Sequence, residues 1–137
     1  MSGELTFENC KPEAIIQEKD ALNNLEEVMK DAIVCISAEA VGAMEKCYRL
    51  TIEYTQQREQ FGSPLSKFQA LQHRMVDMFM ETEYTKSFLL KVLATEDKDE
   101  KTKLIYGLKN QISKSGKLVG EEAVQLHGGM GVTEEMS

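Results

Sequence analysis

Two short segments, far apart in the chain, carry residue types that suit an anionic ligand. The first is Arg58-Glu59-Gln60-Phe61-Gly62. A guanidinium binds phosphate oxygens through two parallel hydrogen bonds, so Arg58 suits a diphosphate, and the ring of Phe61 suits an adenine or ribose face. A surface arginine beside a hydrophobic turn residue is the competing interpretation, and this segment alone does not decide between them.

The second segment is Gln125-Leu126-His127-Gly128-Gly129-Met130-Gly131. Paired glycines at a helix end permit positive φ and close approach of the backbone to a ligand, and Gln125 offers both a donor and an acceptor. A glycine cap followed by an ordinary loop is the competing interpretation. The spacing is not that of a dinucleotide-binding G-x-G-x-x-G, and no strand precedes it.

A long first helix is expected to carry the arginine segment. From about Asp20 to Gln57, apolar residues recur every three or four positions, which predicts one helix about 50 Å long with Asp20 as its N-cap. Gly62 can then turn the chain, Ser63 can cap, and Pro64 suits a first helical turn. The members of the apolar stripe are Leu22, Leu25, Met29, Ala32, Ile36, Ala40, Met44, Cys47, Leu50 and Tyr54.

Two further helices lead to the glycine segment. The second is expected to end near Thr95, and the charged turn 97–101 places acids where the dipole of a third helix favours them. Small residues within the third helix, such as Gly116 and Gly120, predict close approach of another helix or a ligand. The second stripe comprises Phe68, Leu71, Met75, Met78, Thr82, Leu89 and Val92, and the third comprises Leu104, Leu108, Ile112, Ser115, Val119, Ala123 and Leu126.

The predicted fold is all-α, an up-and-down bundle of three long helices that a fourth helix normally completes. That helix would come from a missing tail or from another chain. Residues 4–9 alternate Leu5 and Phe7 with polar residues, which predicts one amino-terminal β-strand. A single strand has no partner in this sequence, and residues 132–137 stop abruptly, so the chain is interpreted as a fragment.

Composition excludes several functional classes. The net charge of −7 over 137 residues argues against non-specific binding to nucleic acid or to an anionic membrane. No apolar run approaches the roughly 20 residues of a membrane span. Three cysteines without a C-x-x-C pair fit reduced thiols in a cytoplasmic setting. His73 and His127 lack the spacing of a metal site, so no metal is expected.

In combination the two segments become specific. The order Arg-x-Gln-Phe-Gly-x-Pro, then Phe68-Gln69, then Gln-x-x-Gly-Gly-x-Gly after two long helices resembles the acyl-CoA dehydrogenase family. The stretch 38–42, Ala-Glu-Ala-Val-Gly, is similar to the first helix of that family's carboxy-terminal domain. Residues 68–75 and 126–133 are most similar to a bacterial branch that includes the small subunit of pimeloyl-CoA dehydrogenase.

This resemblance covers essentially the whole chain and implies its organisation. Residues 1–19 would be a remnant of the family's middle β-domain and a linker, and residues 20–137 would be the helical domain that binds FAD and dimerises. The implied cofactor contacts are Arg58 at the FAD pyrophosphate, Gln60 and Phe61 beside the adenosine part, and Gln69, Gln125, Gly128 and Gly129 elsewhere on the same cofactor. Family members make such contacts largely to FAD of a neighbouring subunit, which implies a homodimer, a higher homo-oligomer or a hetero-oligomer.

The resemblance implies α,β-dehydrogenation of an acyl-CoA, with electron-transfer flavoprotein as the electron acceptor of the parent enzyme. Most members carry the catalytic base after the glycine loop, beyond this chain, and a minority carry it at the position of Ala32, beside Ile33. Asp31 and Glu39 are near that position, but helix geometry points them elsewhere. No catalytic base is therefore assigned, and the chain alone is expected to be inactive.

Two alternatives remain open at this point. The chain could be a helical structural module from a non-catalytic subunit of a heteromeric dehydrogenase, which the residues at Ala32 and Ile33 favour slightly. It could also belong to a relative that uses the same framework for a different reaction, such as a flavin monooxygenase or a nitroalkane oxidase.

Overall fold

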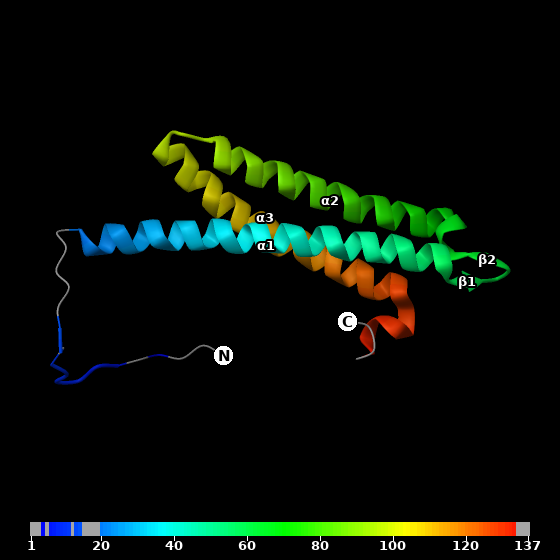
Figure 1. Ribbon diagram of the computed structural model, residues 1–137, viewed down its shortest axis with the longest axis horizontal. Helices are drawn as coiled ribbons and strands as arrows, with labels where there is room; N and C mark the ends of the chain where they lie inside the picture. The colour runs from blue at the N-terminus through cyan, green and yellow to red at the C-terminus, as the bar shows by residue number, and fades with distance from the viewer. Residues whose placement is uncertain (1–3, 5, 12, 15–19, 134–137) are drawn as a thin grey trace.

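Three long helices make up most of the structure, a computed structural model that describes residues 4, 6–11, 13–14 and 20–133. Over these residues the fold is all-α, as predicted, and it includes one small hairpin that the sequence analysis did not predict. Figure 1 shows the helices running back and forth, with the hairpin and the end of the third helix at one end of the bundle. The elements are α1 Ala21–Gln57, β1 Glu59–Gln60, β2 Ser63–Pro64, η1 Leu65–Lys67, α2 Gln69–Ala94, α3 Lys98–His127 and η2 Gly128–Val132.

A tight hairpin reverses the chain between α1 and α2. Strands β1 and β2 pair antiparallel, and the two residues between them, Phe61 and Gly62, have φ of 56° and 78°. Positive φ at both central positions is the geometry that hairpin turns require. Gly62 therefore turns the chain as predicted. Ser63 and Pro64 do not start a helix, because both belong to β2, and α2 begins five residues later at Gln69.

The predicted amino-terminal strand is not formed in the part of it that the structure describes. Residues 4 and 6–9 are coil or bend, and Leu5 lies outside the described residues. A strand needs a neighbour for its backbone hydrogen bonds, and the two described strands pair only with each other. The amino-terminal segment has no sheet to join within this part of the chain.

The two helix starts predicted from acidic residues behave differently. Asp97 caps α3, because its carboxylate accepts a hydrogen bond from the backbone N–H of Glu100 at 2.8 Å. Asp20 occupies the N-cap position of α1, but its carboxylate makes no capping bond to the backbone. It accepts instead from the side-chain amide of Asn23 at 3.5 Å.

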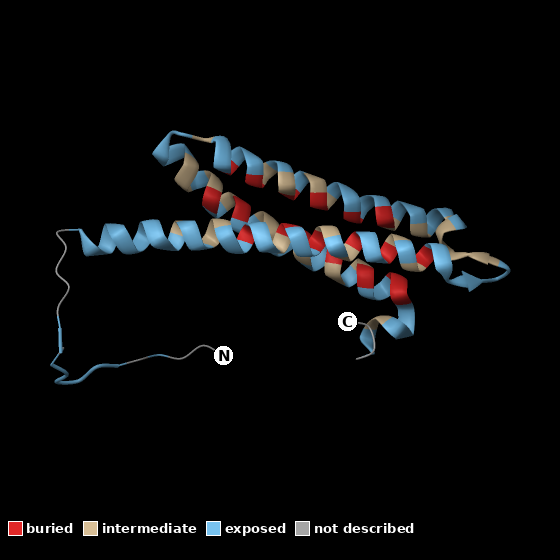
Figure 2. Cartoon of the chain, in the orientation of Figure 1, coloured by how far each residue is buried: buried red, intermediate tan, exposed pale blue. Residues whose placement is uncertain are grey.

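The buried faces of α2 and α3 are close to those predicted. In α2 the residues Met75, Met78, Thr82, Leu89 and Val92 are buried, together with Thr85. The buried set in α3 includes Leu108, Ser115, Val119, Ala123 and Leu126, to which Ile105 and His127 are added. Figure 2 shows these residues along the inner faces of the bundle.

The predicted stripe of α1 is largely wrong as a description of the core. Leu22, Leu25, Met29 and Ile36 are exposed. The buried face lies about one residue further round the helix and comprises Ser37, Val41, Met44, Tyr48, Thr51 and Thr55. Polar residues can be buried here because Thr51 and Thr55 donate to the carbonyls of Cys47 and Ile52, both at 2.9 Å. The amino-terminal half of α1 is mostly exposed (Figure 2), and its large apolar residues Leu22, Leu25, Val28, Met29 and Ile36 are among the exposed ones.

Close approach at the predicted glycines of α3 is limited, whereas Gly107, which the sequence analysis did not single out, lies close to α2. A Cβ on Gly107 would lie 3.1 Å from the ring of Phe88, and one on Gly116 would lie 4.0 Å from the sulfur of Met44. A Cβ on Gly120 would meet nothing within 4 Å among the described residues. The glycines therefore help α2 more than α1 to pack against α3.

We expect Met78→Ala to lower the free energy of unfolding by about 2–5 kcal/mol, because Met78 is 0% exposed at the centre of the core. Equilibrium unfolding in urea measures this. Met80→Ala, on the same helix at a residue 54% exposed, is the matched control and should change the free energy by less than about 0.5 kcal/mol. Equal effects of the two substitutions would contradict this core.

Candidate functional site

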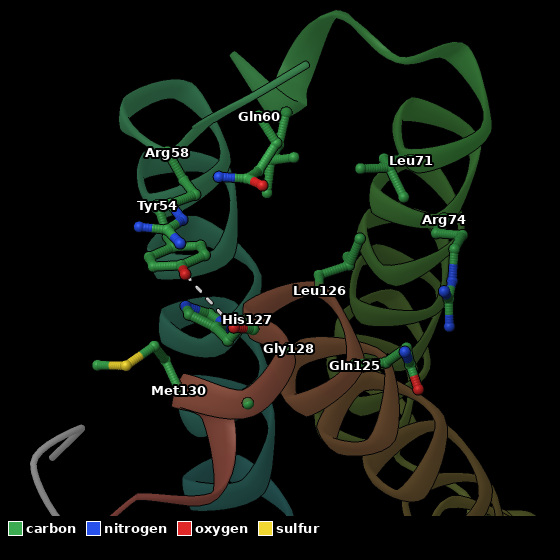
Figure 3. A pocket seen from close by; sticks show the side chains of 12 residues that line it. Tyr54, Arg58, Gln60, Leu71, Arg74, Gln125, Leu126, His127, Gly128 and Met130 are labelled. Carbon is green, nitrogen blue, oxygen red and sulfur yellow. Dashed lines mark hydrogen bonds between the residues drawn. The ribbon is translucent and has the colours of Figure 1, made fainter. Parts of the chain in front are cut away.

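One pocket lies where the end of α1, the start of α2 and the end of α3 meet (Figure 3). Its volume is about 500 Å³. Five of the seven residues predicted to bind a cofactor line it: Arg58, Gln60, Gln125, Gly128 and Gly129. The other lining residues are Tyr54, Leu65, Leu71, Arg74, Leu126, His127 and Met130. Folding thus brings together two segments that are about 70 residues apart in the sequence.

Arg58 is held at the end of α1 by its backbone. Its N–H donates to the carbonyl of Tyr54 at 2.9 Å, and its own carbonyl accepts from the N–H of Leu65 at 2.8 Å. The side chain is exposed and has neither an ion-pair partner nor a hydrogen bond within the described residues. A positioned backbone with an unpaired guanidinium leaves all five of its N–H donors available to an anion.

The glycine loop ends α3 and turns back on it. Gly128 has φ of 61° and donates its backbone N–H to the carbonyl of Gln125. The loop comes closest to α3 at Gly131, where a Cβ would lie 2.6 Å from the carbonyl oxygen of Val124. Gly128 and Gly129 are exposed at the pocket, and a Cβ on Gly129 would meet nothing within 4 Å among the described residues. Their backbone is therefore open to a ligand.

Arg74 is a second guanidinium in the pocket, which sequence reasoning did not identify. It comes from α2 and forms an ion pair with Glu122 of α3 through its Nε atom. The hydrogen bond to Glu122 raises the pKa of Arg74 above its usual value. Because Glu122 neutralises it, Arg74 adds less to the positive potential than Arg58 does. An arginine inside an amphipathic helix gives no sequence signal of such a position.

Two predicted residues, Phe61 and Gln69, do not line the pocket. The side chain of Phe61 is 93% exposed at the tip of the hairpin. Its ring packs edge-on against that of Phe68, with 6.2 Å between the ring centroids. Gln69 is the first residue of α2 and is exposed. The turn geometry explains the position of Phe61, because both central residues of a two-residue hairpin turn project away from the strands. Contacts from these two residues to a cofactor remain predictions.

The position considered for a catalytic base lies elsewhere. Ala32 and Ile33 line a separate groove of about 280 Å³ between α1 and α3, whose only charged lining residue is Lys109. Asp31 and Glu39 are exposed and do not line that groove. Along α1, Ala32 and Arg58 are separated by a rise of about 39 Å. No carboxylate in the described chain is therefore placed to act from the Ala32 position.

Two absences apply to the part of the chain that the structure describes. No group of three or more histidine, cysteine, aspartate or glutamate side chains is placed to hold a metal ion. None of its helices is apolar over enough of its length to span a membrane.

We expect Gly131→Ala to loosen the glycine loop, because the new methyl group would meet the Val124 carbonyl at 2.6 Å. Overpacking of this kind should lower the local opening free energy by about 1 kcal/mol or more. Amide hydrogen exchange across residues 128–132 measures the change. Gly129→Ala is the matched control, with open space for a methyl group, and identical exchange in both variants would contradict the close approach.

Known proteins are similar to this chain in both sequence and fold. A family model described as the C-terminal domain of acyl-CoA dehydrogenase matches residues 24–137. Acyl-CoA dehydrogenase IpdE2 of Mycolicibacterium smegmatis is 35% identical over 104 residues, which are 76% of this chain and 32% of that protein. Isovaleryl-CoA dehydrogenase of Solanum tuberosum is 29% identical over 140 residues, covering 96% of this chain and 33% of that protein.

Solved structures of similar fold lead to the same family. Butyryl-CoA dehydrogenase from Megasphaera elsdenii superposes with a TM-score of 0.81 at 29% identity, over 88% of this chain and 31% of that one. A structure of PigA with FAD and proline gives a TM-score of 0.80 at 28% identity, over 87% of this chain and 31% of that one. The chain spans about a third of the length of the relatives that it matches. It belongs to the acyl-CoA dehydrogenase family and corresponds to that family's C-terminal domain.

Proposed function

We propose that this chain is the FAD-binding and dimerising helical part of an acyl-CoA dehydrogenase, with residues 20–137 as that domain and residues 1–19 as a remnant of the middle β-domain and a linker. The observation that carries the proposal is the unpaired guanidinium of Arg58 in the same pocket as the exposed backbone of Gly128 and Gly129. The PigA structure, which holds FAD, shares the fold that places these groups. FAD would supply the acceptor for a hydride from the substrate.

The residues present fit a diphosphate. The chain has a net charge of −7, so an anion is attracted only where a cation is placed locally. Arg58 is such a cation, and its planar fork matches two phosphate oxygens. Gln60 and Gln125 add neutral hydrogen-bonding groups in the same pocket, and the glycine backbone allows the ligand to approach without meeting a side chain.

A shared site across two copies would account for the residues outside the pocket. Phe61 and Gln69 are both exposed, so each is accessible to a cofactor held by a neighbouring subunit. Along α1, Arg58 and Ala32 are separated by a rise of about 39 Å. In a dimer, two copies could each contribute a different end of this helix to one shared site.

The exposed apolar face of α1 gives a physical reason for association. Leu22, Leu25, Val28, Met29 and Ile36 are all exposed on its amino-terminal half, where the described chain offers no buried residue before Ser37. Contiguous exposed apolar surface of this kind is typical of an interaction site. We assign this face to the oligomer, as a homodimer or higher homo-oligomer, with a related helical subunit as the heteromeric alternative.

For the parent enzyme we propose α,β-dehydrogenation of an acyl-CoA, with electron-transfer flavoprotein as the acceptor. The names of the relatives support the substrate class. The chain by itself should be inactive, because its Ala32 groove holds no carboxylate to remove a proton. Reduction of FAD by an acyl-CoA in the presence of this chain alone would contradict that part of the proposal.

A second candidate function is a non-catalytic helical subunit of a heteromeric dehydrogenase. The observation that favours it is the same apolar groove, whose only charged lining residue is a lysine. Mixing the chain with a catalytic partner subunit separates the two functions. Activity that depends on the partner's own base, and survives every carboxylate substitution in this chain, would support the non-catalytic role.

We expect Arg58→Gln to weaken FAD binding by about 10- to 100-fold, because charge-assisted hydrogen bonds to the pyrophosphate are lost. Titration calorimetry of the 137-residue chain with FAD, and with ADP as a shorter probe, measures the affinity. Arg58→Lys keeps the charge but not the planar fork, so its affinity for FAD should lie between those of the unsubstituted chain and Arg58→Gln. FAD binding by the unsubstituted chain should weaken as the salt concentration is raised.

The control for this experiment is Lys46→Gln, which removes one exposed cation on α1 outside the pocket. It should bind FAD as the unsubstituted chain does. If Arg58→Gln and Lys46→Gln have the same affinity, the FAD site is not at this pocket.

We expect light scattering to give the unsubstituted chain the molar mass of two or more copies. A double variant with Leu25→Glu and Ile36→Glu should have a molar mass closer to that of one copy. Two buried carboxylates would be unpaired in an apolar interface. Lys46→Glu places the same charge on an exposed polar position of α1 and should leave the mass unchanged. A monomeric unsubstituted chain at micromolar concentration would contradict the assignment of this face.

A further inference from the structure

Tyr54 and His127 link the two halves of the candidate site, and neither was singled out as a site residue by the sequence. Their rings contact each other with centroids 4.4 Å apart and an interplanar angle of 35°. The hydroxyl of Tyr54 donates a hydrogen bond to the backbone carbonyl of His127 at 3.4 Å. Figure 3 shows the two residues next to each other in the pocket, with the hydrogen bond drawn from the Tyr54 hydroxyl to the His127 carbonyl.

Each member of the pair is fixed in its own helix. His127 is 8% exposed, and its Nδ1 lies 2.7 Å from the carbonyl oxygen of Ala123. Because a carbonyl only accepts, Nδ1 carries a proton and donates this hydrogen bond. Tyr54 lies in the last turn of α1, and its carbonyl accepts the backbone N–H of Arg58 at 2.9 Å. Tyr54, which binds the backbone of Arg58, is therefore in contact with His127, which precedes Gly128.

This link has a consequence for the glycine loop. Gly128 and Gly129 are exposed, and the loop that they begin turns back onto α3 at Val124. Tyr54 contacts His127, the last residue of α3 before that loop. Helix α3 also packs along α1 elsewhere. The contact between Tyr54 and His127 lies where the last turn of α1, which precedes Arg58, meets the residue that precedes the loop.

We propose that Tyr54 and His127 are positioning residues that hold the glycine-loop backbone opposite Arg58, so that the nucleotide site is formed before the cofactor arrives. The proposal rests on the proposed function for the identity of the ligand. A site held in its binding geometry avoids the ordering cost of binding, so loss of the link should weaken affinity and loosen the glycine loop together.

The test uses Tyr54→Ala, which removes both the ring contact and the hydrogen bond, and Tyr54→Phe, which removes only the hydrogen bond. In the 137-residue chain, Tyr54→Ala should weaken FAD and ADP binding by about tenfold. Tyr54→Phe should weaken it by about threefold or less, since the ring contact remains. Tyr84→Ala is the matched control, an exposed tyrosine on α2 outside the pocket, and should bind as the unsubstituted chain does.

Amide hydrogen exchange distinguishes positioning from a general loss of stability. In ligand-free Tyr54→Ala, exchange should become faster across residues 128–132, with the core amides of α2 and α3 unchanged. Unchanged loop exchange with unchanged affinity would overturn the proposal, and so would an equal increase in the core. If the unsubstituted chain binds neither FAD nor ADP, the proposed function fails, and the loop exchange still decides whether Tyr54 holds the loop.

Discussion

The contact between the carboxyl ends of α1 and α3 is the constraint on which the candidate site depends. Arg58 belongs to one helix end and the glycine loop to the other, and the chain between them runs the length of the bundle and back. Neither segment could form a site alone, because each presents only one kind of group, a cation or an open backbone. The packing of three helices determines that they share one pocket.

Charge within the pocket is divided unequally between its two arginines. Arg74 is paired with Glu122, an interaction that joins α2 to α3 and neutralises the guanidinium. Arg58 has no such partner among the described residues. One guanidinium thus serves the fold and the other remains available to a ligand, which directs an anion to the α1 side of the pocket in a chain that is acidic as a whole.

Helix α1 has one face in the core and another that is exposed. One face joins the core through Val41, Met44 and Tyr48, while the more apolar face at Leu25 and Ile36 remains exposed. A helix that is apolar on two sides usually packs against a partner on each side. Helices α2 and α3 together cover only one side of α1. The proposed assembly and the proposed sharing of the cofactor site therefore depend on the same helix.

Local and periodic features were determined by the sequence itself. Asp97 as a helix cap, the turn at Gly62, and the buried faces of α2 and α3 follow from residue type and spacing, since hydrogen-bonding capacity, positive φ and the helical period act over a few residues. The ordered combination of the arginine and glycine segments also indicated the family. Only the tertiary structure decided which apolar face of α1 enters the core, that Phe61 points outward, and that Tyr54, Arg74 and His127 belong to the pocket. These depend on how helices rotate and pack against one another, a relation between residues far apart in the chain that no local pattern encodes.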